Sequence, residues 1–204
     1  MKAKLISILI GLILVSVPKS NAQNLRFGLF GGYDIVTIHQ TPLDPQLNGQ
    51  PYDPIMSYNI NGFISLKSTG IWGISVEPGL IQKGGLLYKS KAELKYLQMP
   101  LLADIYILQR LYFSIGPEFA YMISAKAINP NSIQDISEII NKKFEFSGSI
   151  GINYMIGKKM GIGLKYNHGL TYIYKSPQYG DNWEILRWLY YYNEYFQLRV
   201  SFRI

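Results

Sequence analysis

The sequence contains no cysteine, which rules out disulfide bonds and the attachment of a lipid to a cysteine thiol. It has two histidines, His39 and His168, so a metal site built on them would need both on one wall and a third ligand. The glycine-rich nucleotide-binding patterns and the HExxH and GxSxG motifs are absent. Beyond residue 22, no segment approaches 18 consecutive apolar residues, so no membrane-spanning helix is predicted there. We therefore predict a protein that is not an enzyme and has no catalytic residue, metal or cofactor.

Residues 1–22 have the pattern of a secretory signal peptide. Two lysines precede an apolar run over residues 5–17, and Ser20-Asn21-Ala22 supplies the small residues of a cleavage site. The alternative, a transmembrane anchor, would need roughly 20 apolar residues. Cleavage after this triplet would leave residues 23–204 as one domain and lower the net charge from +7 to +4, because three lysines leave with the signal. The remaining basic residues are scattered, so no nucleic-acid partner is expected.

The last nine residues alternate between large apolar and polar side chains. In a strand, such alternation places the two kinds of side chain on opposite faces. The apolar positions are Phe196, Leu198, Val200, Phe202 and Ile204, and the polar positions are Gln197, Arg199, Ser201 and Arg203. This pattern is typical of a transmembrane barrel strand, which has lipid on one face and a polar lumen on the other.

Eight segments of the chain show the same period of two residues. They are roughly residues 25–40, 56–67, 71–84, 95–108, 111–124, 144–156, 160–174 and 194–204. Short connections at 68–70, 109–110 and 157–159 alternate with long ones at 41–55, 85–94, 125–143 and 175–193. Outer-membrane barrels have short periplasmic turns and longer external loops. A soluble, lipocalin-like barrel would bury its apolar face instead.

We therefore predict an all-β fold, an eight-stranded antiparallel up-and-down transmembrane barrel. The predicted location is the outer membrane of a Gram-negative cell, and an even number of strands places both termini in the periplasm. Outer-membrane lipid is then an expected partner.

The predicted polar faces carry as many acids as bases. They supply Arg26, Asp34, Lys67, Glu77, Asp104, Glu118, Glu145, Lys165, Arg199 and Arg203. An eight-stranded barrel is only wide enough inside for side chains, and charges held there must pair, because an isolated buried ion costs several kcal/mol. We predict a network of Arg26, Asp104, Glu118, Glu145, Lys165, Arg199 and Arg203 that plugs the lumen, with Arg26 near Arg199 where the barrel closes. The alternative is a path for a proton or a small solute.

Three segments resemble motifs of the PorT-like outer-membrane β-barrel proteins. Residues 96–102 resemble the YLEIPLL strand, residues 113–121 resemble the GPxxxY strand that follows it, and residues 165–173 resemble the RYxxGLTNI segment. The chain departs from these patterns mildly, at Met99 and Tyr172. The resemblance covers nearly all of residues 23–204 and implies an eight-stranded outer-membrane barrel. One member of that family is linked to protein secretion across the outer membrane.

The two longest predicted loops have distinctive composition. Residues 175–193 carry aromatic residues, among which Tyr179, Trp183, Trp188 and Tyr190 are candidates for contact with a partner. The alternative for these residues is the aromatic girdle of the membrane interface. In residues 125–143, Ile133, Ile136, Ile139 and Ile140 fall on one helical stripe that could lie over the barrel mouth.

These observations predict a scaffold or binding protein that acts through its external loops, with a role in protein secretion or envelope assembly and with proteins of those systems as partners. Two alternatives remain open. The first is a channel or transporter for small solutes. The second is an enzyme that modifies outer-membrane lipid, for which His39, Asp181 and Ser176 are the candidate residues.

Overall fold

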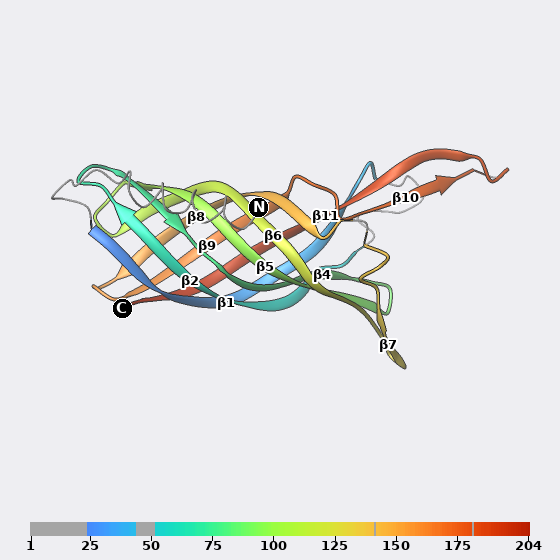
Figure 1. The fold of residues 1–204 in the computed structure, drawn as a ribbon, viewed down its shortest axis with the longest axis horizontal. Helices are drawn as coiled ribbons and strands as arrows, with labels where there is room; N and C mark the ends of the chain where they lie inside the picture. The colour runs from blue at the N-terminus through green and yellow to red at the C-terminus, as the bar shows by residue number, and fades with distance from the viewer. Residues whose placement is uncertain (1–23, 44–51, 141, 181) are drawn as a thin grey trace, which may run out of the picture.

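The computed structural model describes residues 24–43, 52–140, 142–180 and 182–204, and the predicted signal peptide lies outside them. The described residues form antiparallel strands that wind into a long barrel (Figure 1). The strands are β1 (Asn24–Thr41), β2 (Ile55–Lys67), β3 (Trp72–Val76), β4 (Gly79–Leu87), β5 (Ser90–Tyr106), β6 (Leu111–Asn129), β7 (Ser132–Asp135), β8 (Phe144–Ile156), β9 (Met160–Gly169), β10 (Tyr174–Tyr179) and β11 (Ile185–Arg203). Within this part of the chain, no helix is long and apolar enough to cross a bilayer.

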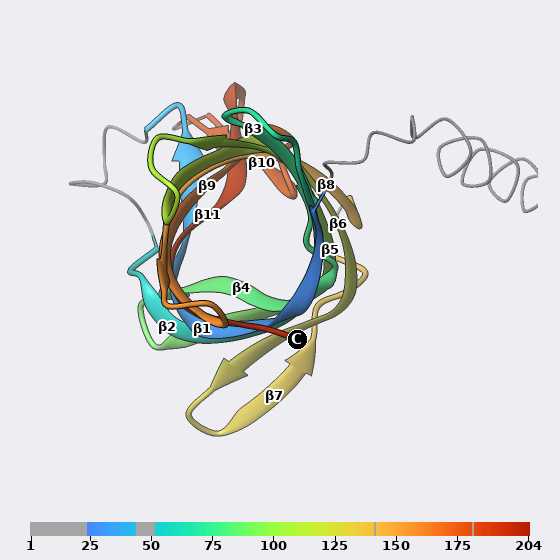
Figure 2. The same ribbon diagram turned by 90° about the vertical axis from the view of Figure 1, so that its left-hand side faces the viewer.

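The first and last strands close the ring. β1 pairs with β11 from Gly28 opposite Arg203 to Thr41 opposite Tyr190. The wall then runs through β2, the β3–β4 pair, β5, β6, β8 and β9 back to β11, as the end-on view shows (Figure 2). β3 and β4 occupy one position of the wall in turn, so the ring has eight positions. The prediction of an eight-stranded antiparallel barrel is confirmed.

The pattern of burial is inverted relative to that of a water-soluble protein. Side chains with large apolar groups point outward and are exposed along every wall strand, for example Phe27, Leu29, Ile60, Ile64, Ile74, Leu97, Ile115, Ile150, Leu164, Leu198 and Phe202. Small and polar side chains point inward and are buried, for example Ser57, Asn61, Gln98, Ser114, Ser147, Asn153, Asn167 and Gln197. An apolar outer band of this extent has to be covered by lipid, which is the arrangement of a transmembrane barrel.

The wall is interrupted between β3 and β4. Pro78 has no N–H for the sheet, and its carbonyl accepts a hydrogen bond from the Gly62 N–H at 2.8 Å. Beyond it, residues 81–85 of β4 are all buried, which departs from the alternation of a wall strand. β4 therefore bends toward the barrel axis on the inner side of β2 and comes close to β1, the next strand beyond β2 (Figure 2).

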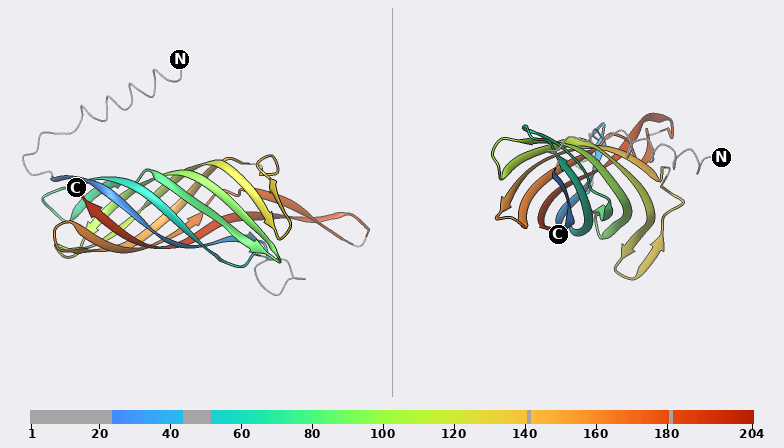
Figure 3. Two further views of the ribbon diagram at one scale, coloured as in Figure 1. Left: turned by 90° about the horizontal axis from the view of Figure 1, so that it is seen from below. Right: turned by 60° about the vertical axis from the view of Figure 1, so that its left-hand side comes forward.

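The end of the barrel where β1 begins and β11 ends has short turns, and the opposite end, the loop end, carries the longer hairpins (Figures 1 and 3). Residues 85–94 were predicted to be a long connection, and this is wrong. β4 and β5 stay paired up to Leu87 opposite Ser90, so only Tyr88 and Lys89 connect them. The turn carries Tyr88 at a φ of 54° without the glycine or asparagine that usually marks such a turn, so it could not be recognised from the sequence.

Two of the three other predicted long connections, 125–143 and 175–193, also contain strands, and most of the third, 41–55, lies outside the described residues. β6 runs on to Asn129 and pairs with β7, and β10 pairs with an extension of β11 that begins at Ile185. Ile133 lies in β7 and is exposed, so the predicted isoleucine stripe is not one helix. Ile136 and Ile140 belong to a single turn, in which the N–H of Ile140 donates to the carbonyl of Ile136 at 3.3 Å, and both pack against the buried cluster at the mouth.

The inward bend of β4 depends on Gly84. Its φ is +137°, and a Cβ there would lie 1.9 Å from the carbonyl oxygen of Ala92. We expect Gly84→Ala to lower the free energy of unfolding in urea by roughly 1–3 kcal/mol. The matched control is Gly148→Ala in β8, where the nearest atom to a new Cβ is 4.0 Å away and no loss is expected. Equal unfolding midpoints for the two variants in the same lipid would contradict this account of β4.

Candidate functional site: the charged lumen and the loop-end hairpin

Six buried ionic side chains form a continuous chain of alternating charge across the lumen. In order they are Glu145, Lys83, Glu118, Lys165, Glu77 and Arg199, from β8, β4, β6, β9, the β3–β4 junction and β11. The ammonium of Lys83 lies 2.6 Å from Glu145 Oε1 and 3.1 Å from Glu118 Oε1. The ammonium of Lys165 lies 3.5 Å from both Glu118 Oε2 and Glu77 Oε2, and Arg199 Nη1 lies 2.8 Å from Glu77 Oε1. Three acids and three bases are balanced in the chain.

Neutral polar groups satisfy the remaining hydrogen-bonding positions of this ion-pair chain. The Tyr195 hydroxyl donates to Glu118 Oε2 at 2.6 Å, and the Asn193 side-chain amide donates to Glu145. Asn153 Oδ1 accepts hydrogen bonds from the Arg199 guanidinium, at 2.6 Å from Nη2. Each buried charge thus has several partners, which is the condition under which buried ions are tolerated.

Two further acids face the lumen outside the ion-pair chain. Asp34 accepts hydrogen bonds from the side-chain amides of Asn59 and Gln197, at about 3.0 Å. Asp104 accepts a hydrogen bond from the Ser114 hydroxyl at 2.6 Å. Both carboxyl groups are therefore held by neutral donors rather than by cations in the part of the chain that the structure describes.

The structure brings together four of the seven residues predicted for the network, namely Glu118, Glu145, Lys165 and Arg199. Asp104 faces the same lumen but is bonded to Ser114. Arg26 and Arg203 lie at the turn end, close enough to Lys67 for the three cations to repel one another, and the described residues offer them no ion pair.

The expected proximity of Arg26 to Arg199 is wrong. Arg199 is opposite Gly32, six residues along β1 from Arg26, which is roughly 20 Å of strand. The barrel closes with a stagger that the prediction did not include, and this stagger places Arg203 near the start of β1 instead.

Lys83 is the residue of the ion-pair chain that the sequence interpretation missed. Its spacing of six residues from Glu77 is even, so the period of two places both on the same face. That signal was available in the sequence.

Above the ion-pair chain, at the loop end, the lumen becomes apolar. Val36, Ile38, Leu94 and Ile173 are buried there together with Tyr96, and the turn carrying Ile136 and Ile140 packs over them. Tyr52 lies in the same cluster, and its burial, with the nearby phenols of Tyr191 and Tyr174, raises the pKa of Tyr52 to about 12. The Tyr52 hydroxyl therefore stays protonated at neutral pH. A cavity of about 230 Å³ remains between these side chains.

The β10–β11 hairpin is the second candidate site. β11 pairs with β1 only as far as Tyr190 and with β9 only as far as Glu194. Within the part of the chain that the structure describes, its residues 185–189 therefore pair with β10 alone. These residues extend beyond the ring by roughly 17 Å of strand, and the hairpin projects from the barrel (Figures 1 and 3). Three of its predicted contact residues, Tyr179, Trp183 and Trp188, are exposed, with Trp183 at 81%. The fourth, Tyr190, lies at the base of the hairpin with its ring against that of Tyr172.

The two histidines meet on the outer wall near the loop end. Their ring centroids lie 6.0 Å apart, and the Tyr166 hydroxyl beside them donates to Glu194 Oε1 at 2.7 Å. Within the described ranges, no three side chains of metal-binding type come close enough to hold an ion. Of the candidate enzyme residues, Ser176 lies beside the Tyr191 hydroxyl at 3.3 Å, and Asp181 is outside the described residues.

We expect the loss of one acid from the ion-pair chain to be costly. Glu118→Gln would leave Lys83 with Glu145 alone and would weaken the contacts of Lys165 and Tyr195, so the free energy of unfolding should fall by about 3 kcal/mol. The control Glu138→Gln alters an exposed carboxylate in the loop-end turn, and it should change the free energy of unfolding by less than about 0.5 kcal/mol. Urea titrations of both variants in the same lipid measure this. A silent Glu118→Gln would show that the ion-pair chain does not stabilise the barrel.

The chain is similar to solved structures of low sequence identity, and for Neisserial surface protein A the likeness extends to the fold. Neisserial surface protein A is 8% identical, with a TM-score of 0.55 over 87% of this chain and 97% of that protein. Ail, the attachment invasion locus protein of Yersinia pestis, is 11% identical, with a TM-score of 0.49 over 90% of this chain and 99% of that protein. The outer membrane protein OprG from Pseudomonas aeruginosa is 14% identical, with a TM-score of 0.45 over 90% of this chain and 97% of that protein. None of the curated proteins matches the sequence.

The sequence itself identifies the family. The family described as "Outer membrane protein beta-barrel domain" matches residues 21–175, which is more than half of the chain. The match covers the strands that contribute Glu77, Lys83, Glu118, Glu145 and Lys165 to the ion-pair chain. With the apolar outer band and the closed antiparallel ring, it shows that the chain belongs to this family of outer-membrane β-barrel proteins.

Proposed function

We propose that this protein is a non-enzymatic binding or scaffold protein of the outer membrane, and that it binds its partner through the β10–β11 hairpin. The observation that carries the proposal is the exposed apolar surface of the hairpin, which lies beyond the end of the barrel wall. We refer to Tyr179, Trp183, Ile185, Leu186 and Trp188 as the hairpin patch. Exposed apolar surface of this kind is typical of sites that contact another molecule.

The length of the hairpin favours a partner over the membrane girdle. A girdle residue lies at the edge of the apolar band, where wall strands on both sides are still paired. β11 loses its partners β9 and β1 before it reaches Trp188, so the hairpin patch lies outside the ring. The predicted girdle role fits Tyr58, Tyr121 and Tyr166 better, because these tyrosines lie on the outer face of wall strands.

The backbone of the hairpin also supports binding. A two-stranded hairpin is marginally stable by itself, and each of its edges has unpaired N–H and C=O groups. Among the described residues, β10 pairs only with β11, and residues 185–189 of β11 pair only with β10. A partner that adds a strand to one of these edges would bury both the edge and the hairpin patch. Arg187 ties the hairpin to the β1 end through a hydrogen bond from Nη2 to the Leu43 carbonyl at 2.9 Å.

We further propose that both termini face the periplasm and that the hairpin faces the cell exterior. The even ring and the short turns at the terminal end support this orientation. The resemblance of residues 96–102, 113–121 and 165–173 to PorT-like proteins supports a role in protein secretion or envelope assembly. A protein of that machinery is then the proposed partner.

Site-specific crosslinking in intact cells tests the proposal. We expect a photoreactive amino acid in place of Trp183 to form a discrete protein adduct, because Trp183 lies at the tip of the hairpin. Trp72 is the matched control, since it is an exposed tryptophan of the barrel wall at the turn end and should crosslink to lipid. The Trp183 adduct should fall at least fivefold in a Leu186→Ser variant whose barrel still folds. Adducts with lipid alone at both positions would contradict the proposal.

The structure favours a closed lumen over the alternative of a solute channel. The ion-pair chain spans the lumen from β4 to β11, and β4 itself bends into it. We expect the purified protein to show no stable conductance in planar bilayers. A stable open channel of the wild-type protein would contradict this expectation and favour the transport alternative.

A further inference from the structure

The inward bend of β4 leaves a dent in the outer surface of the barrel. β2 and β4 pair only from Asn59 opposite Ile81 to Asn61 opposite Gly79. Toward the loop end, the two strands are joined by the Ser57 hydroxyl, which donates to the Gln82 carbonyl at 2.7 Å, and then by the bridge between Asp53 and Leu86. The wall between these points is set back toward the lumen, because residues 81–85 are buried.

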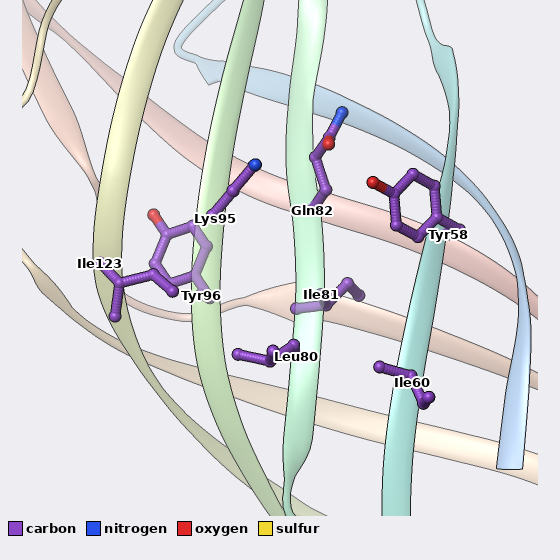
Figure 4. Close-up of a pocket in the computed structure, with 8 residues that line it drawn as sticks. All are labelled: Tyr58, Ile60, Leu80, Ile81, Gln82, Lys95, Tyr96 and Ile123. Carbon is purple, nitrogen blue, oxygen red and sulfur yellow. The ribbon is translucent and has the colours of Figure 1, made fainter.

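The dent is a cavity of about 170 Å³ with an apolar floor and apolar sides (Figure 4). Ile81 and Tyr96 are buried beneath it, and Ile60, Leu80 and Ile123 are exposed around it, on three different strands. An aliphatic cavity of about 150 Å³ inside a protein stays dry and binds benzene. The dent therefore has room for a short stretch of hydrocarbon.

The cavity has a polar end and an apolar end. The Tyr58 hydroxyl, the Gln82 amide and the Lys95 ammonium gather toward one end of the view, and Ile60 and Leu80 lie toward the other (Figure 4). The polar end is the loop end of the barrel, because β2 runs from Tyr58 to Ile60 toward the turn end. Among the described residues Lys95 forms no ion pair, and it is exposed on the outer wall.

We propose that this cavity binds one acyl chain of a membrane lipid, and that Lys95 binds the phosphate of the same lipid. The cavity opens on the apolar outer face of the barrel, next to the exposed Leu97 of β5, so membrane lipid is the molecule that reaches it. Along β5 the exposed side chains change at this end from Met99 and Leu97 to Lys95, which matches the order of chain and phosphate in a lipid. A lysine near the membrane surface attracts an anionic headgroup.

This lipid site is independent of the hairpin patch. It follows from the ion-pair chain, because Lys83 has to leave the wall to reach Glu118 and Glu145. The site requires only that the barrel lies in a membrane. The result of the lipid test therefore does not depend on whether the hairpin patch binds a partner.

Native mass spectrometry of the detergent-solubilised barrel tests the site with phosphatidylglycerol as the probe. We expect the wild type to retain one phosphatidylglycerol molecule and to retain diacylglycerol, which has the same chains without the phosphate, much less. Lys95→Gln should weaken the retention of phosphatidylglycerol roughly fivefold, which is the effect of about 1 kcal/mol for one lysine at a membrane surface. Lys158→Gln, in an exposed turn at the opposite end, is the control and should not change retention.

Filling the cavity is the second arm of the test. Leu80→Trp and, on another strand, Ile123→Trp should abolish the retained lipid, and Leu97→Trp on the neighbouring outer surface should preserve it. Heat-modifiable gel mobility shows which variants have folded, and either filling variant suffices. Retention that is equal in the wild type, the filled variants and the Leu97→Trp control would overturn the proposal. Equal binding of diacylglycerol and phosphatidylglycerol, with no effect of Lys95→Gln, would overturn the assignment of the phosphate to Lys95.

Discussion

Lys83 has no solvent to hydrate its charge, and its ammonium lies between Glu118 and Glu145 in the middle of the barrel. A buried ion without partners costs several kcal/mol, so the backbone has to place this ammonium within ion-pair distance of Glu118 and Glu145. β4 places it there because the strand bends into the lumen after Pro78 and because Gly84 adopts a positive φ. The closed lumen and the dented outer wall both depend on this contact.

The same contact explains how a narrow barrel can hold the six charges of the ion-pair chain. The wall position shared by β3 and β4 contributes Glu77 and Lys83, each of β6, β8, β9 and β11 contributes one ion, and acids and bases alternate along the chain. Amides and hydroxyls such as Asn153, Asn193 and Tyr195 occupy the remaining positions. Such a network stabilises one register of the ring, because a slip of one residue on any strand would turn its charge toward lipid.

Stability and binding are separated along the barrel axis. The ion-pair chain occupies the middle of the lumen, an apolar cluster around Leu94 and Ile173 lies above it, and the hairpin patch extends beyond the wall. The turn with Ile136 and Ile140 packs over that cluster at the mouth. Substitutions in the hairpin should therefore leave the charges that hold the barrel together undisturbed, which suits the proposed role of the hairpin as a binding surface on a rigid support.

The sequence alone determined the fold class, because the period of two residues, repeated along eight segments, is enough to separate an apolar outer face from a polar inner one. It also determined that Glu118, Glu145, Lys165 and Arg199 face inward, since side-chain direction in a strand is a local property. The tertiary structure decided which of these charges meet, because that depends on the stagger between strands, and the stagger moved Arg26 and Arg203 away from the network. It also decided that the predicted loops 85–94 and 175–193 contain paired strands, since strand pairing there depends on a neighbouring strand rather than on an apolar face. The dent beneath Leu80 could not be predicted from sequence, because it arises where one strand leaves the wall to satisfy a charge on another.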